Sequence, residues 1–198
     1  NPSDLLLAQG IYMLRPALPA VVGGEGVGRI VAIGDRVSNV KVGDRVNIPF
    51  GTFAWAEKVL APGKGLFVVP EAIDPKQAAM LTINPMTAVL LLSEFIKLPK
   101  DSWVAFNTGN SGVGRSLIAV AKSRGIKTVA IVRRAELIDE LKRLGANVVV
   151  VQSASMPAEV MKETGAAKIS LGFDAVGGEA TDSLASVLAY EGQLVVFG

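Results

Sequence analysis

The feature that most constrains the fold is a glycine-rich turn between an apolar run and a helical pattern. Residues 103–106, Trp-Val-Ala-Phe, form a short apolar run typical of a buried parallel strand. The glycine-rich segment 107–114 follows, and residues 115–124 then show a helical pattern that ends before Gly125. A second apolar run occupies residues 128–132. The order strand, turn, helix, strand predicts one unit of a parallel sheet.

The turn itself carries a phosphate-binding pattern. Gly109, Ser111 and Gly114 occupy the three glycine positions of the G-x-G-x-x-G fingerprint, with serine in place of the middle glycine. In this pattern, backbone N–H groups and the N-terminus of the helix approach the pyrophosphate of a dinucleotide closely. We therefore predict a dinucleotide site formed by Gly109, Ser111, Gly112, Val113 and Gly114.

Two arginines indicate which dinucleotide is bound. Proteins that bind NADH, which has no 2′-phosphate, usually have an acidic residue about 20 residues after the glycines. The carboxylate of this residue forms a hydrogen bond with the ribose 2′-hydroxyl. This chain has Arg133 and Arg134 at that position. Because guanidinium groups pair with a phosphate that a carboxylate would repel, the spacing favours NADPH over NADH. The alternative is that the two arginines simply open the next helix as a solvated turn.

The composition excludes several kinds of chemistry. The chain has no cysteine and no histidine, which excludes disulfides, a thiol nucleophile, an imidazole base and the usual nitrogen or sulfur zinc sites. A metal site made only of carboxylates stays open, although no acidic cluster in the sequence indicates one. The 20 basic and 18 acidic residues give a net charge of +2, which favours neither nucleic acid nor a membrane surface as a partner. The longest apolar stretch, residues 78–92, is too short and too polar to span a bilayer.

The two halves of the chain differ in pattern. Up to about residue 88, short valine- and isoleucine-rich pieces alternate with glycine, proline and Gly-Asp turns, which predicts a small β-barrel-like domain. Its strands are expected at 27–34, 46–49, 57–60 and 65–70. From residue 102 onward, strand and helix patterns alternate, which predicts a doubly wound parallel sheet.

The remaining elements follow from the same patterns. Asp74 and Pro75 predict the start of a helix. Further strands are expected at 148–151, 169–176 and 194–197, and further helices at 85–96, 135–144, 157–164 and 181–189. A dinucleotide fold usually has six strands. Because the pattern offers five and the chain begins without methionine, we expect a fragment of a longer protein.

With both halves in view, four segments carry a resemblance to a known family: Gly24–Gly34, Val40–Val46, the turn ending in Ser-Gly-Val-Gly, and Leu144-Gly-Ala146. The sequence resembles the medium-chain dehydrogenase/reductase superfamily over all 198 residues. The resemblance implies an α/β protein with two domains. A partial GroES-like β-barrel catalytic domain would cover residues 1–88, and a partial Rossmann-type dinucleotide-binding domain would cover residues 89–198.

Within that superfamily, the missing cysteines and histidines exclude the zinc alcohol dehydrogenases. The segments 1–4, 9–12, 83–88 and 110–114 are similar to mitochondrial-type trans-2-enoyl thioester reductases. Quinone reductases belong to the same zinc-free branch but generally lack the Asn84-Pro85 pair. The resemblance implies NADPH-dependent reduction of the C=C bond of an enoyl thioester or enone. It also implies a homodimer, located in the cytoplasm, or in the mitochondrial matrix if the source is eukaryotic.

A site without zinc or histidine suits C=C reduction better than alcohol oxidation. Hydride addition to the β-carbon of an enoyl thioester places negative charge on the carbonyl oxygen, which hydrogen-bond donors can stabilise. The α-carbon then takes one proton. Tyr12, at a position resembling the catalytic tyrosine of the enoyl reductases, is the candidate donor. The alternative is that the ring of Tyr12 packs in the barrel with its hydroxyl at the surface.

Four further positions are candidates for contact with the cofactor. Asn84 resembles a family asparagine beside the nicotinamide, although a simple helix cap explains it equally well. Thr87 lines the cofactor cleft or bonds to its own helix. Gly177 and Gly198 follow expected strands, at the edge where ligands of such sheets bind. Asp174 is expected to form a turn rather than to act as a catalytic acid.

Two other functions stay open at this stage. The first is an NADPH:quinone oxidoreductase on the same fold. The second, of another class, is a non-catalytic protein that binds NADPH. Turnover of enoyl thioesters, enones and quinones would separate the three.

Overall fold

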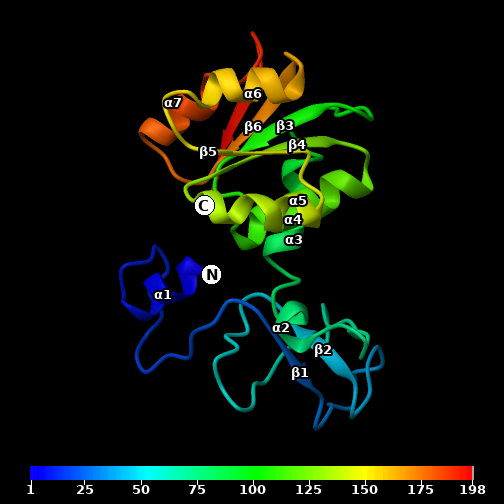
Figure 1. Cartoon of the computed structure of the whole chain (residues 1–198). Helices are drawn as coiled ribbons and strands as arrows, with labels where there is room; N and C mark the ends of the chain where they lie inside the picture. Colours follow the sequence, from blue (N-terminus) through cyan, green and yellow to red (C-terminus); the bar gives the residue numbers. More distant parts are fainter. Residues whose placement is uncertain (198) are drawn as a thin grey trace. The chain divides into compact units, whose positions relative to one another are not determined.

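The computed structural model describes residues 1–197, and the chain divides into two compact units (Figure 1). The first unit comprises Asn1–Ile83, and the second begins at Asn84. The boundary expected after residue 88 therefore lies inside helix α3 (Asn84–Leu91). This helix belongs to the second unit because Ala88 and Leu91 are buried in the same core as Leu117.

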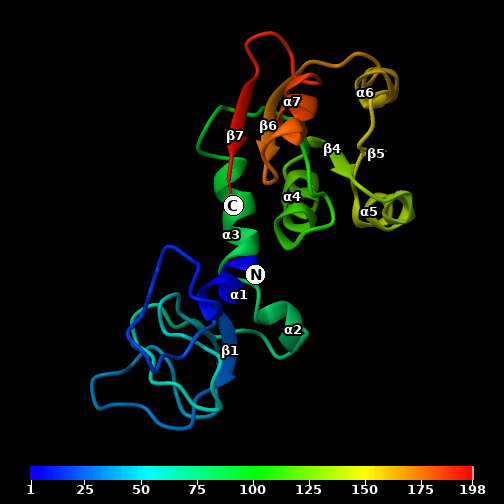
Figure 2. The same cartoon turned by 90° about the vertical axis from the view of Figure 1, so that its left-hand side faces the viewer.

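The second unit contains a five-stranded parallel sheet, as predicted. Its strands are β3 (Trp103–Phe106), β4 (Lys127–Val132), β5 (Val148–Val151), β6 (Ile169–Asp174) and β7 (Gln193–Val196). The strand order is β5-β4-β3-β6-β7, so β5 and β7 form the two edges (Figure 2). The chain moves outward from β3 in one direction and then in the other, which places the topological switch point between β3 and β6.

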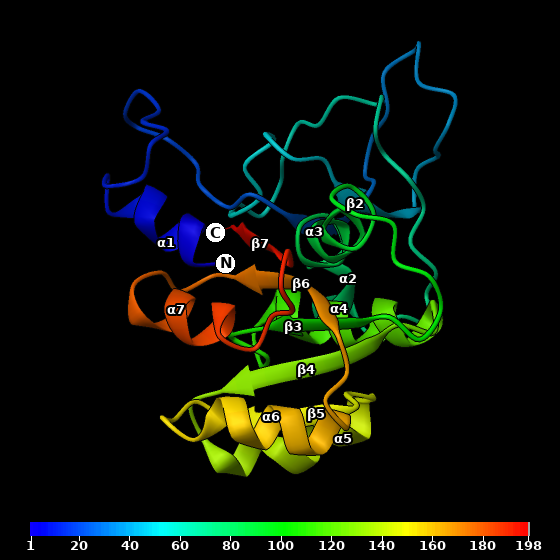
Figure 3. The ribbon, with the colours of Figure 1, turned by 90° about the horizontal axis from the view of Figure 1, so that it is seen from above.

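Helices cover both faces of this sheet. They are α3, α4 (Gly112–Ser123), α5 (Ile138–Leu144) after the short 3₁₀ turn η1 (Ala135–Leu137), α6 (Met156–Thr164) and α7 (Glu179–Ala185). Figure 1 shows α4 and α5 on one face and α6 and α7 on the other. The arrows of β4 and β6 point the same way in Figure 3, as a parallel sheet requires.

The two faces have separate apolar cores because side chains alternate along each strand. In β3, Val104 and Phe106 contribute to the core shared with α3, α4 and α5. Ala105 contributes to the opposite core, which contains Met156 of α6 and Leu184 of α7. All five of these side chains are at most 1% exposed. Apolar residues therefore occupy both sides of the strand, which explains its uninterrupted apolar sequence.

Some elements of the second unit end earlier than the sequence predicts. Helix α3 ends at Leu91 rather than residue 96, because the chain then turns and the Ser93 N–H donates to the Leu90 carbonyl, three residues back, at 3.0 Å. Strand β6 ends at Asp174 rather than residue 176, because the next N–H groups turn back to the Asp174 carboxylate. Helix α7 ends at Ala185 rather than residue 189, because the Ala189 N–H bonds to the Ile169 carbonyl of the sheet at 2.9 Å.

The first unit contains less regular structure. It has the helix α1 (Pro2–Ala8), which the sequence patterns do not predict, the antiparallel strands β1 (Gly26–Arg29) and β2 (Arg45–Ile48), and the short helix α2 (Pro75–Ala78). The predicted start of α2 is confirmed. The Asp74 side chain caps it by accepting from the backbone N–H groups of Lys76 and Gln77 at 2.9 and 3.1 Å.

The barrel strands of the first unit are shorter than predicted. The strand expected over 27–34 ends at Arg29, and the segment 57–60 forms no strand. The segment 65–70 lies beside β2, where it forms a single bridge between Val68 and Val46. Valine-rich pieces identify positions that face an apolar interior, whereas a strand also needs a hydrogen-bonded neighbour along its whole length. The sequence pattern reports the first requirement and not the second.

Candidate functional site

The glycine-rich turn joins the carboxyl end of β3 to the N-terminus of α4, as predicted. Ser111 caps α4, and its hydroxyl accepts a hydrogen bond from the Gly114 N–H at 3.0 Å. The Ser111 N–H in turn donates to the Thr108 carbonyl at 2.8 Å. Serine at the middle position of the fingerprint therefore performs the capping role that a glycine there could not perform.

Two glycines of the fingerprint are required by close packing. A side-chain Cβ at Gly114 would lie 2.6 Å from the carbonyl oxygens of Thr108 and Gly109, so the helix would have to move away from the turn. A Cβ at Gly109 would lie 3.0 Å from the Cβ of Ala130 in β4. The two glycines therefore hold the turn against the helix and the neighbouring strand.

A cavity of about 320 Å³ opens at the carboxyl edge of the sheet, beside this turn. Its lining comes from the residues at or just after the ends of four strands: Asn107, Thr108, Asn110, Ile131, Val132, Arg133, Gln152, Ala175 and Val176. The cavity lies at the switch point, where open parallel sheets bind their ligands. Of these residues, only Arg133 is predicted as a site residue from the sequence, although the others lie within or shortly after predicted strands.

The two predicted arginines differ in their placement. Arg133 lines the cavity and leaves β4 with an exposed side chain. Arg134 lies outside the lining, and its Nε is 3.4 Å from the Glu136 carboxylate on the exposed surface. Arg133 is therefore the arginine that faces the candidate site. The predicted contact of Arg134 with the cofactor stays a prediction.

Two buried polar residues connect β3 to β6 at the same edge. The Asn107 amide donates to the Asp174 carboxylate, and its Oδ1 accepts from the Ala175 N–H at 2.9 Å. The Asp174 carboxylate also accepts from Val176, Gly177 and the Thr181 hydroxyl. Burial raises the pKa of Asp174, but hydrogen bonds from Thr181, Asn107 and the loop outweigh it and leave the pKa below its ordinary value. Asp174 is therefore a turn-forming carboxylate, as the sequence suggests.

Other predicted cofactor residues lie around the turn. Asn84 is buried and occupies the first position of α3, and its amide lies against Gly112, where an added Cβ would come within 2.7 Å of Nδ2. Val113 packs against the core of this unit. Gly177 has a φ of 82° and follows Val176 of the cavity lining. Thr87 is half-buried on α3 and does not line the cavity, and Gly198 lies outside the described residues.

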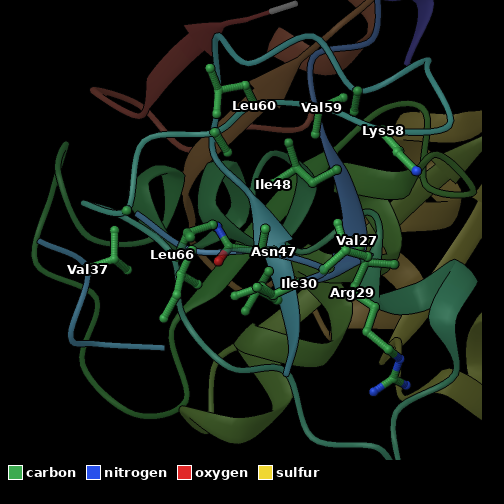
Figure 4. Close-up of a pocket in the computed structure, with 18 of the residues that line it drawn as sticks. Val27, Arg29, Ile30, Val37, Asn47, Ile48, Lys58, Val59, Leu60 and Leu66 are labelled. Carbon is green, nitrogen blue, oxygen red and sulfur yellow. The ribbon is translucent and has the colours of Figure 1, made fainter. Parts of the chain in front are cut away.

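Tyr12 belongs to the first unit. It follows α1, is half-buried, and its backbone N–H donates to the Leu6 carbonyl at 3.2 Å. The same unit contains an apolar cavity of about 340 Å³ (Figure 4). Val27, Ile30 and Ile48 line this cavity, and Tyr12 does not. The predicted role of Tyr12 therefore stays a prediction.

Two features are absent from residues 1–197. Because the chain has no histidine and no cysteine, a metal site here would need acidic side chains. No three acidic side chains in this part of the chain lie where they could hold a metal ion together. None of the helices in this part of the chain combines the length and the apolar character needed to cross a membrane.

Comparison with known families assigns both halves of the chain. Residues 1–71 match the alcohol dehydrogenase GroES-like domain, and residues 112–198 match the zinc-binding dehydrogenase family. These two domains occur in the order that the sequence resemblance implies. The chain belongs to the medium-chain dehydrogenase/reductase superfamily. The zinc in the second family's description does not carry over to this chain, which has neither histidine nor cysteine.

Individual relatives agree with this assignment. The chain is 40% identical over 204 residues to the mitochondrial enoyl-[acyl-carrier-protein] reductase of Caenorhabditis elegans, covering all of this chain and 58% of that protein. A Bacillus thuringiensis protein named as an NADPH:quinone reductase is 30% identical, with a TM-score of 0.87 over 99% of this chain and 60% of its own. A mycobacterial protein solved in complex with NADPH is 29% identical, with a TM-score of 0.86 over 100% of this chain and 62% of its own. The chain thus spans little more than half the length of these relatives.

Proposed function

We propose that this chain binds NADPH and forms part of a reductase that acts on the C=C bond of α,β-unsaturated thioesters or related enones. The observation that carries the proposal is the cavity at the switch point. It combines a capped glycine-rich turn with Arg133 at the position where an NADH site has an acid. The sequence similarity to a mitochondrial enoyl reductase supports the substrate class.

The residues present fit the cofactor. The N-terminus of α4 offers backbone N–H groups and the positive end of a helix dipole to the pyrophosphate. Arg133 offers a guanidinium group to the 2′-phosphate. Asn84, Thr87, Gly177 and Gly198 are proposed as further contacts near the nicotinamide. When bound, NADPH supplies the hydride.

The chain has a candidate for the remaining chemistry. Reduction of the C=C bond needs a hydrogen-bond donor for the developing enolate oxygen and a proton for the α-carbon, and neither step needs a metal. An ordinary phenol is protonated at neutral pH and can donate. We assign this role to Tyr12, because its position in the sequence resembles that of the catalytic tyrosine of the enoyl reductases.

The assembly and location of the protein are part of the proposal. A homodimer is the assembly that the family resemblance implies. The mitochondrial relative supports a place in the mitochondrial matrix for a eukaryotic source, and the cytoplasm is the corresponding place for a bacterial one.

The cofactor is tested by titrating the intact protein with NADPH and with NADH while nicotinamide fluorescence is recorded. We expect Arg133→Ala to weaken NADPH binding about ten-fold or more and to leave NADH binding unchanged, because only NADPH has the 2′-phosphate. Arg134→Ala is the matched control and should have a much smaller effect. Equal binding of both nucleotides by the wild type would contradict the proposed cofactor.

The substrate class is tested by comparing a crotonyl thioester with a naphthoquinone, each with NADPH. A quinone reductase is the second candidate because the Bacillus thuringiensis protein shares this fold over nearly the whole chain. Preferred turnover of the thioester supports the enoyl reductase, and preferred turnover of the quinone supports the alternative. Tight binding of NADPH without turnover of either compound would indicate a non-catalytic NADPH-binding protein.

A further inference from the structure

The buried pair of Asn107 and Asp174 lies at the proposed NADPH cavity, where Asn107 is part of the lining and Asp174 directly precedes the lining residue Ala175. Asn107 follows β3 and Asp174 ends β6, the two strands on either side of the switch point. Asp174 is 0% exposed and Asn107 is 4% exposed. The loop that follows Asp174 supplies Ala175 and Val176 to the cavity lining. The pair therefore links two of the four strands whose ends line the site.

The pair fixes the backbone of that loop. The N–H groups of Ala175, Val176 and Gly177 all donate to it, at 2.9 Å to Asn107 and at 2.9 and 3.2 Å to Asp174. Because a trans peptide is planar, each carbonyl points opposite to the N–H that follows it. The carbonyls of Ala175 and Val176 therefore point away from the pair.

The first turn of the next helix is held by the same carboxylate. The Thr181 hydroxyl donates to Asp174 Oδ2, while the three other donors use Oδ1. One carboxylate thus connects the end of β3, the loop 175–177 and the start of α7. A carboxylate suits this position because it only accepts hydrogen bonds and has capacity for about four.

We propose that Asn107 and Asp174 are positioning residues for the bound cofactor. They hold the loop 175–177 in the conformation that forms part of the cavity wall, and Asn107 itself also lines the cavity. This inference rests on the proposed NADPH site. It assigns a role in cofactor affinity to two residues that the glycine-rich fingerprint does not contain.

A second connection in the same sheet provides a matched control. At the opposite, amino edge, the Asn147 side chain accepts from the Thr128 N–H at 3.0 Å, and the Asn147 N–H donates to the Thr128 hydroxyl at 3.3 Å. This connection also joins two strands, but neither residue lines the cavity. A loss of stability at this edge should therefore leave cofactor affinity unchanged.

The experiment measures two quantities for each variant of the intact protein. The Kd for NADPH comes from nicotinamide fluorescence, and the free energy of unfolding comes from urea titration. We expect Asn107→Leu and Asp174→Ala to raise the Kd about ten-fold, because each leaves N–H groups of the loop without a partner. Asn147→Ala should lower the free energy of unfolding and keep the Kd within about two-fold of the wild type.

The conservative variant Asp174→Asn separates positioning from charge. Its amide oxygen can accept from Asn107, Val176 and Gly177, and its amide nitrogen can donate to the Thr181 hydroxyl. We therefore expect its Kd to stay within about three-fold of the wild type. If Asp174→Ala does not fold, Thr181→Val removes only the bond to Oδ2. It should raise the Kd by a smaller factor than Asn107→Leu.

The outcomes distinguish this inference from the proposed function. If the wild type binds NADPH and Asn107→Leu binds it equally well, the positioning role is wrong and the cofactor site stands. The role is also wrong if Asn147→Ala and Asn107→Leu lower the free energy of unfolding equally and also raise the Kd for NADPH equally. If the wild type does not bind NADPH, the proposed cofactor is wrong, and the positioning role is overturned with it.

Discussion

Arg115 of α4 pairs with Glu140 of α5, with Nη1 and Oε1 2.7 Å apart. The same arginine donates through Nε to the Asn110 carbonyl of the glycine-rich turn at 3.1 Å. The hydrogen bond from Arg115, followed by its charge, lowers the pKa of Glu140. Arg115 therefore connects α5, through the ion pair, to Asn110, a residue that lines the cavity. No local sequence pattern predicts this pair, because its two residues lie 25 positions apart.

We expect Arg115→Ala to weaken NADPH binding by about three- to ten-fold, because the Asn110 carbonyl loses its donor and the turn becomes more mobile. Both side chains are about two-fifths exposed, so the free energy of unfolding should change little. Glu140→Gln is the matched comparison, since it keeps the bond from Arg115 to Asn110. Fluorescence titration checks both variants. An equal effect of the two would show that the ion pair, and not the bond to the turn, determines affinity.

Replacement of Gly114 by alanine should disrupt the turn. The added Cβ would lie 2.6 Å from two backbone carbonyl oxygens, which cannot move as a flexible side chain can. We expect a loss of about 1–3 kcal/mol in the free energy of unfolding and a rise of at least about ten-fold in the Kd for NADPH. Urea titration and nicotinamide fluorescence measure these two quantities.

Gly34→Ala is the control for this substitution, because no atom lies within 4 Å of an added Cβ there. It should leave NADPH binding unchanged. Wild-type binding by Gly114→Ala would mean that the turn does not bind a dinucleotide.

The lowered pKa of Asp174 predicts how stability depends on pH. An unfolded aspartate has a pKa of about 3.9, and the folded value is lower. The carboxylate therefore stabilises the fold above about pH 4, and this stabilisation is lost as the pH falls through the folded pKa. Other acids contribute equally to the wild type and to Asp174→Asn, so their difference in unfolding free energy isolates this group.

We expect that difference to be largest near neutral pH and to shrink as the pH is lowered from about 5 to about 3. Urea titrations of both proteins at several pH values measure it. A difference that stays constant over this range would show that the charge of Asp174 does not contribute to stability.

Substitution of Tyr12 tests the assigned donor. We expect Tyr12→Phe to lower kcat/KM for a crotonyl thioester by about 100-fold and to leave the Kd for NADPH unchanged, because only the phenolic O–H is removed. Steady-state kinetics at saturating NADPH provide the measurement. Tyr190→Phe, at a tyrosine that is 89% exposed, is the control. Equal activity of Tyr12→Phe and the wild type would remove Tyr12 from the mechanism.

Much of the second unit could be predicted from local sequence. The strands β3 and β5 lie at the predicted residues, and the turn between β3 and α4 has the predicted glycine positions. These features depend on short-range causes: apolar runs that suit a doubly covered sheet, and glycines that avoid a steric clash. The first unit was less predictable. Its strands are limited by which segments find hydrogen-bonded neighbours, and these neighbours are distant in sequence.

The sequence by itself determined the superfamily, the alternation of strands and helices, the dinucleotide turn and the absence of histidine and cysteine chemistry. Tertiary structure alone decided which of two adjacent arginines faces the cavity and which helix begins the second unit. It also brought Asn107 and Asp174 together, although they are 67 positions apart. The physical reason is the same in each case. Residue type and spacing set the local conformation, whereas the packing of strands β3 and β6 side by side sets which side chains meet.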